Sequence, residues 1–440
     1  MPPKITKKTK AKEKEINITD LLEESIMTMK AKASKKSKAP VLDIDSFSTN
    51  IEDSDTEGLN LEPFTLQYVF GAKQVKPGTI LEIIGPEQVG KTTLVFNLLG
   101  MFMRTNPYIV SLYIETEGRN KLPDNERIKS CLSSNREEAD KLFKQISIKS
   151  GRSLVDVLES IELWAKTTRP ILTGAGIPES RPMVVVVDTL SKCMPPVEAA
   201  SAGYGDTSKA VHLDEGSNLG FSFTMQKWSR SCVDLMDKYN LFLIFVSHQN
   251  VKIDMMAGIR TAATDNKTRI GGQALHQSAT FQCTLTRIGG INNPVSNEAI
   301  SHYIKMKMLK NSRNSDKRSC IYELRTGQLE DTSVERERSI NFNYGIADIL
   351  AEHRLGVVMK TKEKANWTAK GLKDAPRADI AEAFISDNEL VETIGSSLRI
   401  KGYALPTYDK SNLSGDTTVD PLKNDETSDA EQEQSNEIEY

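Results

Sequence analysis

A short stretch near residue 90 combines the residue types that bind phosphate groups. It fits the phosphate-loop pattern G-x-x-x-x-G-K-[ST] and consists of Gly85, Pro86, Glu87, Gln88, Val89, Gly90, Lys91, Thr92 and Thr93. An apolar run over residues 79–84 precedes it, and a helical pattern over residues 94–99 follows it. A strand, a glycine turn and a helix start gather backbone N–H groups around a phosphate. The stretch predicts a nucleoside triphosphate site in which Lys91 reaches the β- and γ-phosphates.

Two oxygen-bearing side chains could hold a magnesium ion beside that loop. The Thr92 hydroxyl follows the loop lysine, and Asp188 ends the apolar run over residues 183–187. An acid at the carboxyl end of a parallel strand lies beside the phosphate loop, where it can orient Mg²⁺ through water. Strands often end in an acid without any such role, but the position downstream of a phosphate loop favours Thr92 and Asp188 as the metal side of the site.

Hydrolysis of a nucleotide also needs a group that positions the attacking water. Glu115 and Glu117 end the apolar run that follows the loop helix, and a carboxylate there can align water with the γ-phosphate. The alternative is that both acids face solvent. Gln249 follows the apolar run over residues 241–246, and its amide can sense the γ-phosphate. His248 is not assigned to the site, because such a histidine more often has a structural role.

A basic segment follows Gln249 and is a candidate nucleic-acid contact. Its basic residues are Lys252, Arg260, Lys267 and Arg269, interspersed with methionines, and Gly271 and Gly272 close it. Basic side chains attract phosphates, and apolar ones can wedge between nucleobases. The segment has no aromatic side chain on which a base could stack. Composition alone therefore leaves two interpretations, a DNA-binding loop and a solvated surface loop.

The elements that must position these residues follow an alternating order. Strand-like apolar runs lie at residues 80–84, 108–114, 183–187 and 241–246, with helical patterns between them. Such alternation is typical of βαβ units and a mostly parallel sheet. Shorter strand-like pieces follow at residues 279–286 and 301–308. We therefore expect an α/β fold with a mostly parallel central sheet.

Composition divides the chain of 440 residues into five parts. We expect a basic, disordered tail over residues 1–16 and an N-terminal helix with a linker over residues 17–60. A nucleotide-binding core over residues 61–345, a small α/β domain over residues 346–408 and an acidic, disordered tail over residues 409–440 follow. The lysines of the first tail either only solubilise the chain or attract nucleic acid.

Bulk properties narrow the class of protein. The formal net charge of −3 neither supports nor excludes a nucleic-acid partner. The five cysteines form no C-x-x-C pair, which disfavours a zinc or redox motif and suits a reducing compartment. The N-terminus lacks the apolar segment of a secretory signal, and no apolar run reaches about 18 residues. We expect a soluble, cytoplasmic protein without a membrane partner.

Several motifs, in order, resemble the bacterial-type RecA recombinases over residues 60–345, and more weakly over residues 346–405. Residues 65–72 and 77–87 are similar to that family's approach to its phosphate loop, including the G-P-E start. Glu115 and Glu117 stand at the family's D-x-E, and Asp188 lies in a similar Walker-B strand. Gln249 matches the glutamine switch at the base of the second DNA loop. Residues 271–275, G-G-Q-A-L, resemble the G-G-N-A-L that closes this loop.

This resemblance implies a RecA-like core, ATP and Mg²⁺ as cofactors, and a helical homo-oligomeric filament on single-stranded DNA, with double-stranded DNA as a secondary partner. ATP would lie between subunits. Glu117 would activate water, and Lys310 and Arg313 would complete the neighbouring subunit's site. The first DNA loop would fall within residues 196–218 and contain Lys209. The N-terminal helix would dock on a neighbour, and the acidic tail would compete with DNA for basic surface.

The chain also departs from the family, and two other functions remain open. Residues 118–127 lack the tyrosine that the family places against adenine, residues 145–182 are expanded, and the second loop is longer. These departures indicate a divergent member, such as a viral one. A ring-forming RecA-fold DNA motor would share Lys91 and Asp188. A nucleotide-binding regulator that has lost recombination would keep the fold without the activity.

Overall fold

The computed structural model describes most of the chain between residues 57 and 403. The described residues are Met27 and the ranges 57–106, 108–117, 125–195, 217–251, 267–269, 272–292, 299–312, 318–325 and 339–403. Both predicted tails, and the predicted N-terminal helix apart from Met27, lie outside these ranges. Within the described part of the chain, no helix has the length and apolar character needed to cross a bilayer.

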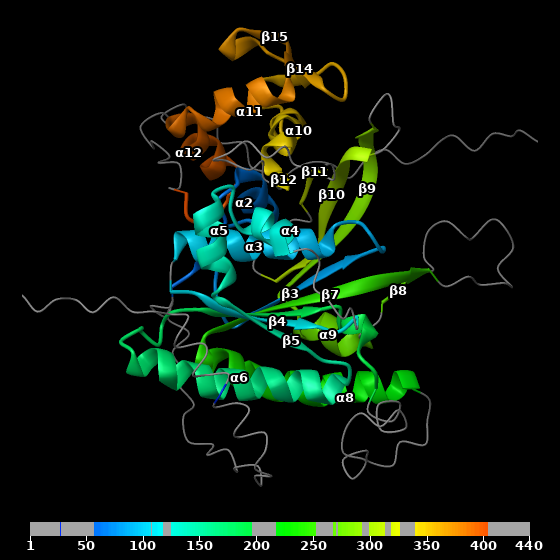
Figure 1. The fold of residues 1–440 in the computed structure, drawn as a ribbon. Coiled ribbons are helices and arrows are strands. Elements are labelled where there is room, and N and C mark those ends of the chain that lie inside the picture. Colours follow the sequence, from blue (N-terminus) through cyan, green and yellow to red (C-terminus); the bar gives the residue numbers. More distant parts are fainter. Residues whose placement is uncertain are drawn as a thin grey trace, which may run out of the picture. The chain divides into compact units, whose positions relative to one another are not determined.

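A large mixed sheet forms the centre of the fold (Figure 1). Its strand order is β12-β11-β10-β9-β3-β7-β6-β4-β5, and β8 pairs with β7 outside this path. Neighbours from β9 to β5 are parallel, whereas β8 to β7 and the pairs from β9 to β12 are antiparallel. The strands are β3 (Thr79–Gly85), β4 (Val110–Glu115), β5 (Ile146–Ser150), β6 (Met183–Asp188), β7 (Leu241–Val251), β8 (Lys267–Arg269), β9 (Phe281–Asn292), β10 (Ala299–Asn311), β11 (Ser319–Arg325) and β12 (Ile340–Asn341).

Helices cover both faces of the parallel part of this sheet (Figure 1). One face packs on α3 (Lys91–Thr105), beside α4 (Asn125–Leu132) and α5 (Arg136–Phe143); the other packs on α6 (Leu154–Gly174) and α8 (Ser217–Tyr239). The position of β6 between the two helical layers explains why its sequence is continuously apolar. Val184 and Val186 belong to the first hydrophobic cluster and Val185 and Val187 to the second, because successive side chains point to opposite faces.

The architecture confirms the expected α/β class with a large, mostly parallel central sheet, and it is compatible with a phosphate-loop nucleotide-binding core. The apolar runs at residues 80–84, 183–187 and 241–246 are all strands. The run at residues 108–114 was placed too early, because β4 begins at Val110 and Tyr108 is partly exposed. Strands β5, β8, β11 and β12 were not predicted, since they are short or lack a continuous apolar run.

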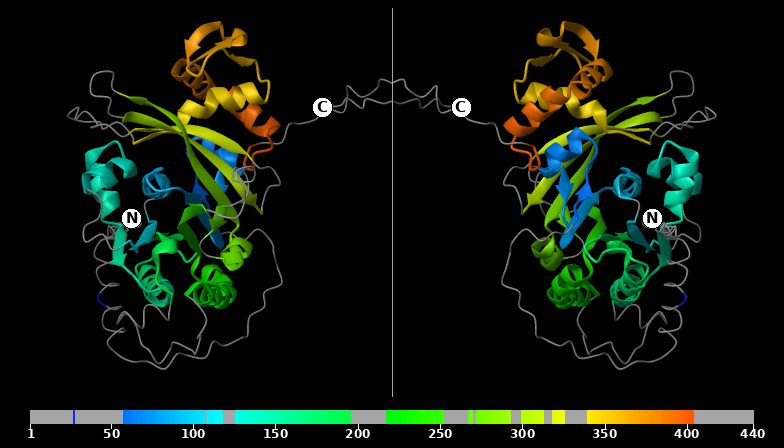
Figure 2. Two further views of the ribbon diagram at one scale, coloured as in Figure 1. Left: turned by 90° about the vertical axis from the view of Figure 1, so that its right-hand side faces the viewer. Right: turned by 90° about the vertical axis from the view of Figure 1, so that its left-hand side faces the viewer.

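Residues 346–403 form a small set of helices around a second sheet (Figure 2). The helices are α10 (Ile346–Glu352), α11 (Arg377–Ile385) and α12 (Asn388–Ser397), and the antiparallel strands are β13 (Val357–Met359), β14 (Lys364–Trp367) and β15 (Leu372–Pro376). Trp367 is buried in this region. Phe384 packs edge-on against Phe64 of α2 (Phe64–Phe70), with ring centroids 4.8 Å apart.

Short elements complete the fold. Strands β1 (Leu59–Asn60) and β2 (Gln74–Val75) pair with each other, and α9 (Gly272–Ser278) precedes β9. Single 3₁₀ turns occur at η1 (Leu190–Lys192), η3 (Phe342–Gly345) and η4 (Thr368–Lys370). All five cysteines are buried and free, so they act as small core residues.

Gly100 provides a test of the packing between α3 and α4. A methyl group at this position would overlap the carbonyl oxygen and Cα of Leu132, so Gly100→Ala must push α4 away. We expect a loss of about 1–3 kcal/mol in the free energy of unfolding, measured by urea denaturation. Gly174→Ala is the matched control, because nothing lies within 4 Å of its new methyl group. Equal stability of the two variants would contradict the close approach of the helices.

Candidate nucleotide site

The predicted phosphate loop joins the end of β3 to the start of α3. Gly90 has a φ of 90° and Gln88 a φ of 59°, so the turn uses the left-handed region that glycine enters without strain. Any side chain at Gly90 would also meet Leu324 of β11. The second glycine of the motif is therefore required both by its backbone angle and by its contact with β11.

The Lys91 side chain is buried at the base of this turn. Its ammonium group donates to the carbonyl oxygens of Gly85 (3.0 Å) and Pro86 (2.6 Å) and lies 3.2 Å from Nδ1 of His248. An ammonium group only donates, so Nδ1 of His248 accepts and the ring proton of the neutral imidazole lies on Nε2. The loop lysine thereby fixes the tautomer of a histidine on β7.

His248 also contacts Glu117, the predicted water-positioning acid. Its Nε2 lies 3.2 Å from Oε1 of Glu117, which accepts the proton that the tautomer places there. Glu117 lies just beyond the end of β4, and its backbone N–H donates to Oε1 of Glu115 at 2.8 Å. Of the two acids, Glu117 therefore reaches the phosphate loop, whereas Glu115 supports the turn.

Asp188, the predicted metal-side acid, lies at the carboxyl end of β6. Three hydroxyl groups surround it: Thr92 Oγ1 donates to Oδ2 at 2.6 Å, Tyr113 to Oδ2 at 2.7 Å, and Thr189 to Oδ1 at 2.9 Å. Thr189 Oγ1 is also 3.1 Å from Glu117, and its single proton can serve only one of these acids at a time. Thr92 and Asp188 offer the hard oxygen ligands that Mg²⁺ prefers, so the pair fits the predicted metal site.

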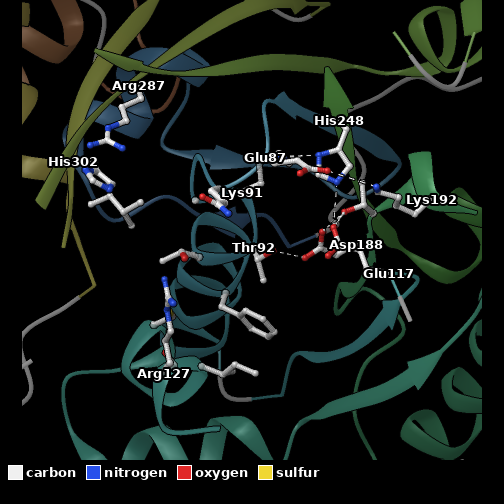
Figure 3. Close-up of a pocket in the computed structure, with 18 residues that line it drawn as sticks. Glu87, Lys91, Thr92, Glu117, Arg127, Asp188, Lys192, His248, Arg287 and His302 are labelled. Carbon is white, nitrogen blue, oxygen red and sulfur yellow. Dashed lines mark hydrogen bonds and ion pairs between the residues drawn. The ribbon is translucent and has the colours of Figure 1, made fainter. Parts of the chain in front are cut away.

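These residues line one pocket of about 640 Å³ (Figure 3). Predicted nucleotide-site residues in its wall are Glu87, Gln88, Gly90, Lys91, Thr92, Thr93, Glu117 and Asp188. Gly85 and Pro86 contribute the carbonyl oxygens that bind Lys91, and Val89 packs in the core. The end of the pocket away from Asp188 has Arg127 of α4, Arg287 of β9 and His302 of β10 (Figure 3). The pocket thus has Glu117 and Asp188 at one end, with Lys192 beside them, and two arginines and a histidine at the other.

Burial and neighbouring charges shift the protonation of the central groups. Burial lowers the pKa of Lys91, while Asp188 and Glu117 oppose this shift. Burial and the nearby Lys91 ammonium lower the pKa of His248, and the hydrogen bond to Glu117 opposes them. A lowered histidine pKa favours the neutral ring at pH 7, which agrees with the tautomer deduced from the hydrogen bonds.

The structure describes the stem of the predicted second DNA loop. Gln249 pairs with Arg269 and Val251 with Lys267, and α9 begins at Gly272. For Gln249, Lys267, Arg269 and Gly272 only the backbone belongs to the described part of the chain. Lys209, Lys252, Arg260, Gly271 and Arg313 lie outside the described residues.

Lys310 is not among the described residues that line this pocket. It lies near the end of β10, half-buried, and its ammonium donates to the carbonyl oxygens of His276 (2.8 Å) and Gln277 (2.9 Å) at the end of α9. Burial lowers its pKa. A single subunit therefore brings Lys91, Thr92, Glu117 and Asp188 together but keeps Lys310 apart from them.

Sequence reasoning missed several pocket residues. His248 follows directly after an apolar strand, and that position was a usable signal. Tyr113 does not line the pocket, but its hydroxyl donates to Asp188; this contact could not be foreseen, because the residue lies within an apolar run. Arg287 and His302 meet in the pocket only through the pairing of β9 with β10.

No protein-family model matches the chain.

The contact between Lys91 and His248 can be tested by NMR titration of labelled histidine. We expect His248 to titrate below its ordinary pKa of 6.5, because its charged form is buried beside an ammonium group. Lys91→Met should raise this midpoint, since it removes the Lys91 charge, one of the two influences that lower the pKa of His248, and leaves the other, burial. Lys129→Met, which removes a lysine from the α4 surface, should leave it unchanged. An unaltered midpoint in Lys91→Met would contradict the contact.

Proposed function

We propose that this protein is an ATPase of the RecA recombinase kind, which forms helical filaments on single-stranded DNA and promotes homologous pairing and strand exchange. The observation that carries the proposal is the meeting of Lys91, Thr92, Asp188 and Glu117 in one pocket at the carboxyl ends of β3, β6 and β4. Acting in the cytoplasm, such a protein would serve recombination and repair of damaged DNA.

The pocket supports ATP hydrolysis through the roles of its own side chains. Lys91 would leave the carbonyl oxygens of Gly85 and Pro86 and bind the β- and γ-phosphates. Thr92 and Asp188 would hold Mg²⁺, which neutralises phosphate charge when it is bound with ATP. Glu117 would accept a hydrogen bond from water and align it with the γ-phosphate. His248 contacts both Lys91 and Glu117, so movement of the lysine onto phosphate would release Nδ1 of the histidine whose Nε2 holds Glu117.

Assembly is supported by the position of Lys310 outside its own subunit's pocket. A cation beside the γ-phosphate stabilises the charge that develops during phosphoryl transfer. In a filament, Lys310 and Arg313 of one subunit would supply this cation to the next subunit's ATP. Bound ATP would then hold subunits together, and its hydrolysis would weaken the interface and release DNA.

The DNA assignment rests on the basic segment between β7 and α9. Lys252, Arg260, Lys267, Arg269, Gly271 and Gly272 are its proposed contact residues, and Lys209 is the proposed contact of the first DNA loop. Strand β7 carries His248 toward the nucleotide and ends two residues beyond Gln249 at Val251. A strand that begins in the core and ends at the DNA loop gives the two ligands a short physical connection, since both would bias the same element.

The first test is ATP hydrolysis with and without single-stranded DNA, on samples also imaged by negative-stain microscopy. We expect DNA to stimulate turnover and extended helical filaments to form, because the cation that completes each site comes from a neighbour. Closed rings with DNA stimulation would instead indicate a ring-forming motor. ATP binding with negligible hydrolysis would indicate a nucleotide-binding regulator.

Two substitutions separate binding from chemistry. Lys91→Ala should abolish ATP binding, because the cation at the phosphate loop is lost. Glu117→Gln should bind ATP and DNA normally but turn over about 10²–10⁴-fold more slowly, since the amide positions water without accepting its proton. Isothermal titration and steady-state kinetics measure the two effects. Normal ATP affinity in Lys91→Ala would refute its role, and wild-type turnover in Glu117→Gln would transfer the role of base to Glu115.

A further inference from the structure

A buried carboxylate lies next to the nucleotide site but outside it. Glu82 of β3 is 2% exposed. Its Oε1 accepts from Ser247 Oγ at 3.0 Å and its Oε2 accepts from Gln282 Nε2 at 2.6 Å. A carboxylate is costly to bury unless donors satisfy it. The chain thus maintains an acid in its sheet that ATP chemistry does not use.

Glu82 determines how the amide group of Gln282 is oriented. Gln282 donates from Nε2 to Glu82 and therefore directs its Oε1 away from that carboxyl group. Oε1 of Gln282 lies 2.5 Å from Nδ1 of His276. His276 must therefore donate from Nδ1. The fully buried Gln282 fixes an exposed histidine in the last turn of α9.

This last turn of α9 is also what binds Lys310. The Lys310 ammonium donates to the carbonyl oxygens of His276 and Gln277, which lie among the last carbonyls of a helix and have no intrahelical partner. An ammonium group has three donors, so two bonds to α9 fix its direction and one donor remains. Within the described part of the chain, no carboxylate forms an ion pair with Lys310.

We infer that Glu82, Gln282 and His276 are positioning residues that aim Lys310, through the end of α9, at the ATP of a neighbouring subunit. Lys310 keeps its two bonds to α9 and turns its third donor to the γ-phosphate. The inference rests on the proposed function, in which Lys310 acts on the neighbouring site. Helix α9 directly follows the proposed DNA-binding segment and sets the position of the Lys310 ammonium group. A shift of α9 on DNA binding would therefore move this cation.

The test uses the full chain and compares substitutions at His276. His276→Ala removes the N–H group that donates to Gln282. His276→Asn retains such a donor, because its amide N–H lies as many bonds from Cβ as Nδ1 of histidine does. We expect His276→Ala to lower the DNA-stimulated kcat about 10–100-fold, since small misplacements of a reacting group are costly. KM for ATP and affinity for single-stranded DNA should remain unchanged. His276→Asn should recover most of the kcat.

Further variants separate positioning from a purely structural role. Gln282→Met should lower kcat in the same way, and Thr284→Ala, on the same strand, should behave as wild type. Thermal melting checks that the exposed His276 substitutions leave the fold intact. Wild-type kcat in His276→Ala, or equal loss in the Ala and Asn variants, would overturn the inference while leaving the proposed function standing. If wild-type protein shows no DNA stimulation, the proposed function fails as well.

Discussion

The candidate site depends on the burial of one ammonium group. Lys91 lies beneath its loop, and each of its three donors has an acceptor: two loop carbonyl oxygens and Nδ1 of His248. Because a buried charge without partners would be costly, the loop must fold back on the lysine and the histidine must remain neutral. That neutral tautomer gives Glu117 its hydrogen-bond donor. One satisfied charge therefore fixes the phosphate loop, a histidine on β7 and the acid beyond β4.

Parallel strands make this arrangement possible. The carboxyl ends of β3, β7, β6 and β4 lie side by side at one edge of the sheet, so residues far apart in sequence meet there. Helices on both faces favour apolar side chains along the strands, and the polar groups of the candidate site lie mainly at the strand ends. Tyr113 is an exception: its ring stacks on Phe96 within the core, while its hydroxyl reaches Asp188. It orients the acid from inside the sheet.

Much of this could be predicted from sequence, because local signals determine it. The phosphate loop has a fixed spacing of glycine and lysine, and the long apolar runs define the central strands. The end of the pocket away from Asp188 could not be foreseen: Arg287 and His302 meet through a paired hairpin whose register shifts near Tyr303, and neither residue carries a local signal. His248 illustrates the intermediate case. Its position after a strand was visible, but its contact with Lys91 depends on the pairing of β7 with β3.

Strand β7 connects the two polar systems of the core. Neighbouring residues on a strand point to opposite faces, so Ser247 reaches Glu82 while His248 reaches Glu117 and Lys91. The candidate site and the Glu82 chain are therefore attached to adjacent backbone positions of one strand. A displacement of β7 would therefore affect both sets of hydrogen bonds at once. The strand that holds His248 in the candidate site thus also contacts, through Ser247, the acid that orients Gln282, His276 and the end of α9.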